Sequence, residues 1–417
     1  IGVAFFGVVT TFLIWRVAKV WFDEKAGLIA SLFYAISPVV NTYSHSSWNP
    51  NVMPFFALLA IWGVWQFWQK NKFYWLAIEG ILLSIAIQSH YLGILLAPVV
   101  GLFFIIKVIS LKKGKSPDIN KLLVNFALCI LSFALLTVAP LIWFDLRHNF
   151  LNYKAFYKFF SERQATVNLK PYKAIPEMWP LWKMVVTRLI AGKNEFFGFW
   201  ISLALGLSSM GVIVFTALRR RRLILKNKGL ILLLSWFFVG LLGMGLYKQH
   251  IYDHYFGFLF PAVFLFFSVV LNRLWTNRFY FKLSAGILFT AIVFLNLSEN
   301  PFKYNPNFQM DRTKEVSEKI IKESEGESFN LGLIAKQNYD AGYRYFLEKA
   351  GKKAVEIDPQ QADKTVTKQL FVVCEEMVCQ PATHPQAAIA NFGWSKIEEQ
   401  WDFTWGAKLF KLVHNKP

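Results

Sequence analysis

The sequence is poor in charged side chains for its length. Only 17% of its 417 residues are Asp, Glu, Lys or Arg, whereas 55% are hydrophobic and 18% are aromatic. A soluble protein of this size needs more charge on its surface, so the composition excludes that class. The long apolar runs instead predict a polytopic α-helical membrane protein with a bundle of about ten membrane helices. The predicted spans are 1–22, 27–43, 51–69, 73–89, 91–109, 122–144, 196–218, 230–247, 256–272 and 279–298.

Acidic residues are scarcest before residue 299. Residues 1–298 carry 9 Asp and Glu against 29 Lys and Arg, while residues 299–417 carry 17 against 16. The formal net charge of +19 therefore belongs to the membrane part and does not indicate nucleic-acid binding. The sequence predicts two parts, a transmembrane bundle over 1–298 and a small α/β domain over 299–417.

Basic residues are nearly absent from every second short loop. The loops on one side hold 19 Lys and Arg, among them Arg219–Arg222, Lys226 and Arg278, whereas the short loops near 44–50, 88–91 and 248–255 hold only Lys248. By the positive-inside rule the first set is cytoplasmic. The alternate loops and residues 299–417 are then extracytoplasmic, in a multi-pass protein of the plasma (inner) membrane.

The long outer loop 145–195 is aromatic and basic. An amphipathic helix lying on the outer leaflet would have this composition. A loop packed on the bundle would have it equally, and the sequence leaves both open.

Cysteine is rare, with three residues in the chain. Cys129 lies in an apolar run and is predicted to pack there. Cys374 and Cys379 fall in the extracytoplasmic domain, where a structural disulfide is permitted. A metal site would need further ligands that His384 alone does not supply, and the spacing differs from a redox CxxC motif.

The last domain shows alternating elements. We expect helices near 312–324, 341–350 and 385–391, with strands near 329–334, 354–357, 370–374, 396–403 and 407–413.

Polar side chains gather at the outer turns, where five of the seven histidines fall. Ionisable groups at helix ends that face a bundle cavity are functional candidates, although Tyr, Trp and His are also common at headgroup depth. A metal site at His250, Asp253 and His254 is possible if that segment is helical, but no metal or other cofactor is indicated. The candidates are His45, Trp48, Asn49, Asn51, Gln88, His90, Asp145, Arg147, Lys248, Asp253, His254 and Tyr255.

Cations beside aromatic rings and amides suit a sugar linked to a lipid phosphate. Arg147, Lys248, His254 and Tyr255 are the predicted donor-binding residues. The cavity wall would be formed by His45, Trp48, Asn49, Asn51, Gln88 and His90.

Several stretches resemble family 39 and related bacterial membrane glycosyltransferases of the GT-C fold, which include protein O-mannosyltransferases and lipid A aminoarabinose transferases. They are Asp23-Glu24-Lys25-Ala26-Gly27, Ser37-Pro38, Tyr43-Ser44, Trp48-Asn49-Pro50-Asn51, Phe144-Asp145-Leu146-Arg147-His148-Asn149-Phe150, and Asp253-His254-Tyr255 with Pro261. The chain departs from the family at His45 and Asn51, where relatives often carry Arg and an acid.

The resemblance implies inverting transfer of a sugar from a polyprenyl-phosphate donor to a protein, lipid or glycan acceptor at the outer membrane face. It also implies that residues 1–22 correspond to the family's second helix. The catalytic acid of the first outer loop would then lie N-terminal to Ile1. Within this chain, Asp145 and Asp253 are the candidate bases, and Asp145 could equally pair with Arg147 at a helix end.

Two other classes stay open. A transporter or lipid flippase would place polar residues at mid-bilayer, where the sequence offers only Glu79 and a few Ser and Thr. A non-catalytic scaffold would leave the function to residues 299–417.

Overall fold

The computed structural model describes most of the chain and divides it into two compact units, 1–303 and 304–417. The backbone is described for residues 2–162, 166–168, 170–219, 227–276, 279–306, 308–336, 338–376, 378–403 and 406–415, and side chains over 208–219 are not included. The predicted cytoplasmic residues Arg220–Arg222, Lys226 and Arg278 lie outside the described residues.

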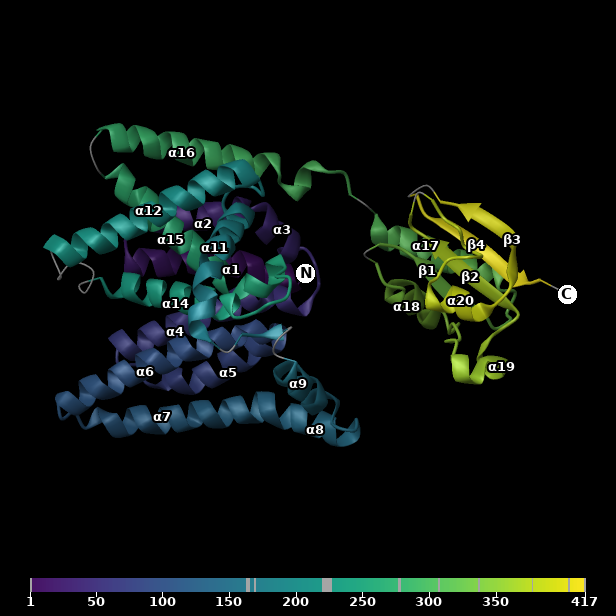
Figure 1. The fold of residues 1–417 in the computed structure, drawn as a ribbon, viewed down its shortest axis with the longest axis horizontal. Helices are drawn as coiled ribbons and strands as arrows, with labels where there is room; N and C mark the ends of the chain where they lie inside the picture. The colour runs from purple at the N-terminus through teal and green to yellow at the C-terminus, as the bar shows by residue number, and fades with distance from the viewer. Residues whose placement is uncertain are drawn as a thin grey trace. The chain divides into compact units, whose positions relative to one another are not determined.

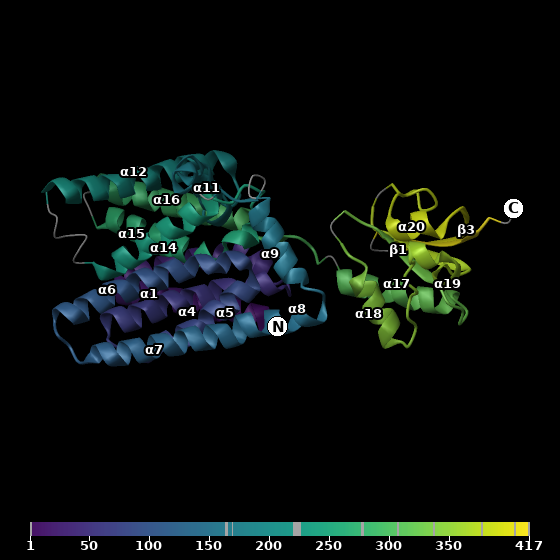
Figure 2. The ribbon, with the colours of Figure 1, turned by 60° about the horizontal axis from the view of Figure 1, so that its bottom comes forward.

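The first unit is a bundle of long helices (Figures 1 and 2). Among the described residues, seven helices are long and apolar enough to cross a membrane, or eight if one bent pair is counted as a single span. A further apolar helix, Tyr74–Ser89, is shorter, and the described side chains of α12, over Glu195–Leu207, are also mostly apolar. Each of the ten predicted spans falls on helical residues, with 27–43 divided between two helices, and the predicted class of polytopic helical membrane protein is confirmed. The helices are α1 (Gly2–Trp21), α2 (Glu24–Ile36), α3 (Pro38–Ser44), α4 (Met53–Gln69), α5 (Tyr74–Ser89), α6 (Leu96–Lys113), α7 (Asp118–Phe133), α8 (Ala139–Arg147), α9 (Leu151–Ser161), α11 (Ile175–Leu189), α12 (Glu195–Arg219), α14 (Lys228–Gly245), α15 (Phe260–Trp275) and α16 (Phe279–Ser298).

Helix α15 supplies the centre of the bundle. Apolar side chains on several sides of it are buried, including Phe264 and Phe267. A helix that is hydrophobic all round belongs in the interior. By contrast, α7 and α8 lie along the lower edge in Figure 1 and expose apolar side chains such as Leu128, Leu131 and Ile142, as a lipid-facing surface requires.

The Asp23–Gly27 motif joins three helices. The Asp23 carboxylate accepts the backbone N–H of Ala26 at 2.8 Å, which caps α2, and it also accepts Asn272 Nδ2 of α15 at 2.7 Å. A Cβ at Gly27 would lie 2.8 Å from the Trp15 carbonyl oxygen, so glycine allows α1 and α2 to approach closely. The motif therefore holds α1, α2 and α15 together in this fold.

The predicted span 27–43 is broken at Ser37-Pro38. Pro38 begins α3, which is bent by 64° from α2. Ser37 has extended backbone, and its hydroxyl donates to the Leu189 carbonyl of α11 at 3.0 Å. The proline cannot continue the α2 hydrogen-bond ladder, so the bend follows from the sequence. It redirects the chain into the turn 45–52, the first of the turns predicted to face outward.

The stretch 145–195 contains two helices of different character. All residues of α9 are at least partly exposed, including Tyr153, Phe156 and Tyr157, so its place on the outer leaflet stays a prediction. Helix α11 packs into the bundle through buried Trp182, Val185 and Val186. The stretch therefore combines features of both alternatives, an exposed helix (α9) and a segment packed on the bundle through an apolar face (α11).

The second unit is a four-stranded sheet with helices on both faces (Figures 1 and 2). The strand order is β1-β2-β4-β3, with β1 and β2 parallel and the other pairs antiparallel. Its elements are α17 (Gln309–Glu323), β1 (Asn330–Ile334), α18 (Ala341–Lys349), α19 (Ala362–Thr365), β2 (Gln369–Cys374), α20 (Ala387–Phe392), β3 (Ser395–Asp402) and β4 (Lys408–His414). The predicted α/β domain is confirmed, but the strand expected at 354–357 is an isolated bridge between Val355 and Asn330. The turn that begins at Asp358-Pro359 ends the extended stretch there.

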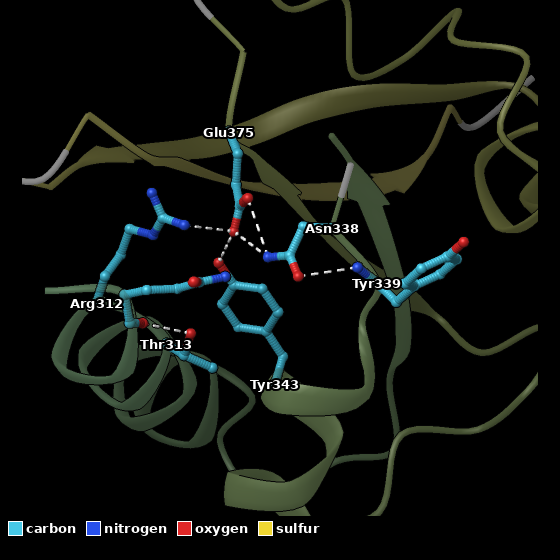
Figure 3. Close-up of polar contacts among 7 residues, drawn as sticks. Arg312, Thr313, Asn338, Tyr339, Tyr343 and Glu375 are labelled. Carbon is cyan, nitrogen blue, oxygen red and sulfur yellow. Dashed lines mark hydrogen bonds and ion pairs between the residues drawn. The ribbon is translucent and has the colours of Figure 1, made fainter. Parts of the chain in front are cut away.

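A buried polar cluster lies where β1 and β2 end (Figure 3). The Glu375 carboxylate accepts hydrogen bonds from Arg312 at 3.0 Å, from the Tyr343 hydroxyl at 2.6 Å and from Asn338 Nδ2 at 2.9 Å. Burial and Glu375 raise the pKa of the Tyr343 phenol, which keeps it a donor. The Cys374 and Cys379 sulfurs are bonded, so Glu375 lies inside a short disulfide ring. The cluster ties α17 and α18 to the end of the sheet.

Candidate active site

The first of the predicted outer turns is held by its two asparagine amides. Asn51 Nδ2 donates to the Ser46 carbonyl at 2.7 Å and closes the turn. Asn49 Nδ2 donates to the Ser89 carbonyl at 3.2 Å, which joins the turn to the end of α5. Trp48, which directly precedes Asn49 in this turn, is about half exposed. The two amides thus hold the backbone of the turn in place, and with it the indole ring of Trp48.

The second predicted outer turn carries Gln88 and His90. Gln88 Nε2 donates to the Leu136 carbonyl at 3.1 Å, within the π-helical segment Ala134–Val138. His90 follows α5, and its Nδ1 accepts the Leu92 backbone N–H at 3.3 Å, capping the 3₁₀ turn Tyr91–Leu95. Burial, together with His254, lowers the pKa of His90 to about 4. His90 is therefore neutral at physiological pH.

The fourth predicted outer turn, around 248–255, is fixed by an ion pair with α11. Arg188 Nε lies 2.8 Å from Asp253 Oδ1 and 3.0 Å from Oδ2, and Arg188 Nη2 also bonds Oδ2. Asp253 begins the 3₁₀ segment Asp253–Leu259, which continues into α15. The guanidinium thus holds in place the backbone that carries His254 and Tyr255.

These three turns bring their rings together. The His254 ring lies 4.5 Å from that of Trp48 and 5.6 Å from that of His90, and His90 lies 4.4 Å from Tyr255. The rings border a cavity of about 440 Å³, named here the histidine–aromatic cavity. Its lining contains no Lys, Arg, Asp or Glu among the described residues. It consists of Trp48, Asn49, Pro50, Ile87, Gln88, Ser89, His90, Tyr91, His254 and Tyr255.

A second cavity of about 700 Å³ has a different lining. Leu181, Met184 and Met244 give it an apolar side, and Lys173 and Lys248 supply positive charge. We name it the lysine cavity. It is lined by Asn168, Tyr172, Lys173, Pro176, Glu177, Pro180, Leu181, Met184, Met244, Gly245, Tyr247, Lys248, Gln249, His250 and Ile251.

Two tyrosines, one from the lining of each cavity, contact each other. Tyr91 lines the histidine–aromatic cavity, Tyr247 lines the lysine cavity, and their hydroxyl oxygens are 2.9 Å apart. Tyr247 also donates to Gln249 Oε1 at 3.3 Å. A ligand with an anionic part and a neutral polar part could reach both cavities across this pair.

Other predicted site residues lie elsewhere. The two Asp145 oxygens each accept a backbone N–H at 2.8 Å, from Asn152 and Tyr153, at the start of α9. The Arg147 guanidinium lies 4.3 Å from the centre of the Trp143 ring. The His45 ring lies 4.9 Å from that of Phe302. These three residues and Asn51 are not among those that line the two cavities in the described part of the chain.

The sequence reasoning missed Arg188, Lys173 and Tyr247. Arg188 interrupts an apolar run inside the predicted outer loop, and an isolated cation in that position could have drawn attention. Its pairing with Asp253 occupies the carboxylate that the possible metal site would have used. No group of three His, Cys, Asp or Glu side chains is close enough to hold a metal ion within the described ranges.

Comparisons with known proteins agree with this architecture. Residues 1–143 match the family described as dolichyl-phosphate-mannose-protein mannosyltransferase. The chain is similar to the crystal structure of ArnT from Cupriavidus metallidurans bound to undecaprenyl phosphate, with a TM-score of 0.59 and 11% identity over 98% of this chain and 83% of that one. The apo structure of the same enzyme gives a TM-score of 0.54 and 12% identity over 98% and 82%. No curated protein matches the chain by sequence. The resemblance to GT-C proteins and the GT-C fold expected from it are confirmed.

Proposed function

We propose that this chain, which has the GT-C fold and whose first 143 residues match a family of lipid-phosphate-dependent mannosyltransferases, is a membrane glycosyltransferase. It transfers a sugar from a polyprenyl-phosphate donor to an acceptor at the outer face of the membrane. The observation that carries the proposal is the meeting of the two differently lined cavities at Tyr91 and Tyr247.

The lysine cavity fits the lipid-phosphate end of the donor. Its apolar side would accept the first isoprenoid units, and Lys173 and Lys248 would face the phosphate. The same cations would stabilise the charge that develops on the phosphate as the sugar leaves. ArnT, the structural relative, was crystallised with a ligand of this class.

The histidine–aromatic cavity fits the sugar. Aromatic rings offer flat faces to the C–H groups of a pyranose, and Asn49 and Gln88 are amides of the type that read hydroxyl groups. Both candidate bases of this chain are held by the contacts described above. We therefore assign Asp253 and Asp145 to positioning, and we name no base among the described residues.

The lysine assignment predicts a loss of donor binding. Replacing both Lys173 and Lys248 with Ala should raise the KM for a polyprenyl-phosphate sugar at least about a hundredfold, because two charge-assisted contacts are removed. The measurement is transfer of radiolabelled sugar by the purified full chain in nanodiscs. Lys154→Ala on exposed α9 is the matched control and should behave as wild type. An unchanged KM in the double variant would show that the donor phosphate does not bind in this cavity. Arg147→Ala in the same assay tests the sequence-based prediction that Arg147 binds the donor.

The outer-face assignment has its own test. Ser46 is exposed in the first outer turn, so Cys introduced there should react with an impermeant maleimide added to intact cells. Gly114→Cys, exposed in the predicted cytoplasmic loop after α6, should react only after lysis. The opposite pattern would invert the proposed topology and move both cavities to the cytoplasmic side.

A further inference from the structure

His90 is held in one orientation from two sides. Its backbone N–H donates to the Ala86 carbonyl at 3.1 Å, and its carbonyl accepts the Gly93 N–H at 2.8 Å. The ring is stacked on Tyr91 with centroids 4.3 Å apart and lies against Tyr255 at 4.4 Å. Rotation of the imidazole would break the Leu92 cap and both ring contacts.

The cap determines which nitrogen carries the proton. Nδ1 accepts the Leu92 N–H, so its lone pair is engaged and a neutral ring must be protonated at Nε2. The groups that face the ring are His254, Tyr255 and Tyr91, and the cavity lining described above carries no carboxylate that would favour the imidazolium. Burial and His254 act in the same direction, since both lower the pKa of His90.

We infer that His90 is a fixed, neutral hydrogen-bond donor, which presents Nε2–H to an oxygen of the sugar in the histidine–aromatic cavity. This inference rests on the proposed function. It assigns His90 to sugar recognition and excludes it as the base that activates the acceptor, because the lone pair a base would use is already engaged. A buried donor left without a partner disfavours binding, so sugars lacking that oxygen should be rejected.

Two nearly isosteric variants distinguish the roles of the two ring nitrogens, because each keeps the role of one and removes or weakens that of the other. In His90→Asn the Oδ1 atom can still cap the 3₁₀ turn, but the donor at the Nε2 position is lost. In His90→Gln the side-chain amide nitrogen reaches the Nε2 position, but the cap is weakened. If the inference holds, His90→Asn folds normally and loses about tenfold to a hundredfold in kcat/KM, while His90→Gln keeps most of the activity. A merely structural role predicts the reverse order.

The assay uses the full chain in nanodiscs with polyprenyl-phosphate mannose, glucose and aminoarabinose as donors. Thermal unfolding is recorded for each variant, and His148→Asn, an exposed histidine stacked on Phe144, is the matched control. The wild-type rate should show no titration of His90 between about pH 5.5 and 8, because the pKa lies near 4.

The outcomes separate the two proposals. A stable His90→Asn variant with wild-type transfer overturns the inference and leaves the proposed function intact. A pH dependence of the wild-type rate near the ordinary histidine pKa that disappears in His90→Asn also overturns the inference, because it would identify His90 as a base. Failure of the wild type to transfer or bind any of the three donors rejects the proposed function, and the inference with it.

Discussion

Replacing Asp253 with Asn should lower sugar transfer by about a hundredfold, because a shift of about 1 Å in a reacting site can cost that much. The carboxylate is mostly buried, at 12% exposure, and makes a bidentate pair with Arg188, which is 34% exposed. Removing it leaves a half-buried guanidinium without its counter-charge. Because Arg188 is partly solvated, we expect a stability loss of about 2 kcal/mol, below the range for fully buried pairs. The larger effect falls on His254 and Tyr255, which follow Asp253 directly.

A double-mutant cycle distinguishes an anchor from a base. If Asp253 anchors the turn, Arg188→Gln should be as damaging as Asp253→Asn, and the double variant no worse than either. If Asp253 were the base, Arg188→Gln would leave the carboxylate in place, and activity would persist with a shifted pH profile. The measurement is kcat/KM against pH for the four proteins. Asp118→Asn is the control, since Asp118 forms an exposed ion pair with Lys121.

The sequence predicts the membrane helices well because their cause is local. An apolar run of about twenty residues must form a helix to satisfy its backbone in a bilayer, whatever surrounds it. The gathering of Trp48, His90 and His254 could be expected for a related reason: loop charge places all three turns at the same membrane face.

The cavities themselves could not be predicted, because they depend on contacts between distant segments. Helix α11 has 15 residues and contains Pro180, so no span was expected there, yet it supplies Arg188 and one wall of the lysine cavity. The partner of Arg188 lies 65 residues further along the chain. The sequence leaves Asp145 as a candidate base for a similar reason. Its carboxylate accepts two N–H groups at the start of α9, and this contact can be seen only once the turn Arg147–Phe150 is folded.

In the second unit, replacing Glu375 with Ala should destabilise the fold by about 3–5 kcal/mol, the usual cost of breaking a buried ion pair from one side. Glu375 is 10% exposed and Arg312 is 16% exposed. Arg312 Nε is already buried without a hydrogen-bond partner, so loss of the carboxylate would leave the guanidinium poorly compensated. Tyr343 and Asn338 would lose their acceptor as well.

Hydrogen exchange in the full chain measures this effect. Amides of β1 and β2 should exchange about two to three orders of magnitude faster in Glu375→Ala, because the pair joins the ends of both strands to α17 and α18. Glu399→Ala, an exposed carboxylate on β3, is the control and should leave exchange unchanged. The double variant Glu375→Leu with Arg312→Leu should recover much of the protection, because no buried charge remains. Unchanged protection in Glu375→Ala would mean that the disulfide ring and the apolar core hold this end of the sheet without the ion pair.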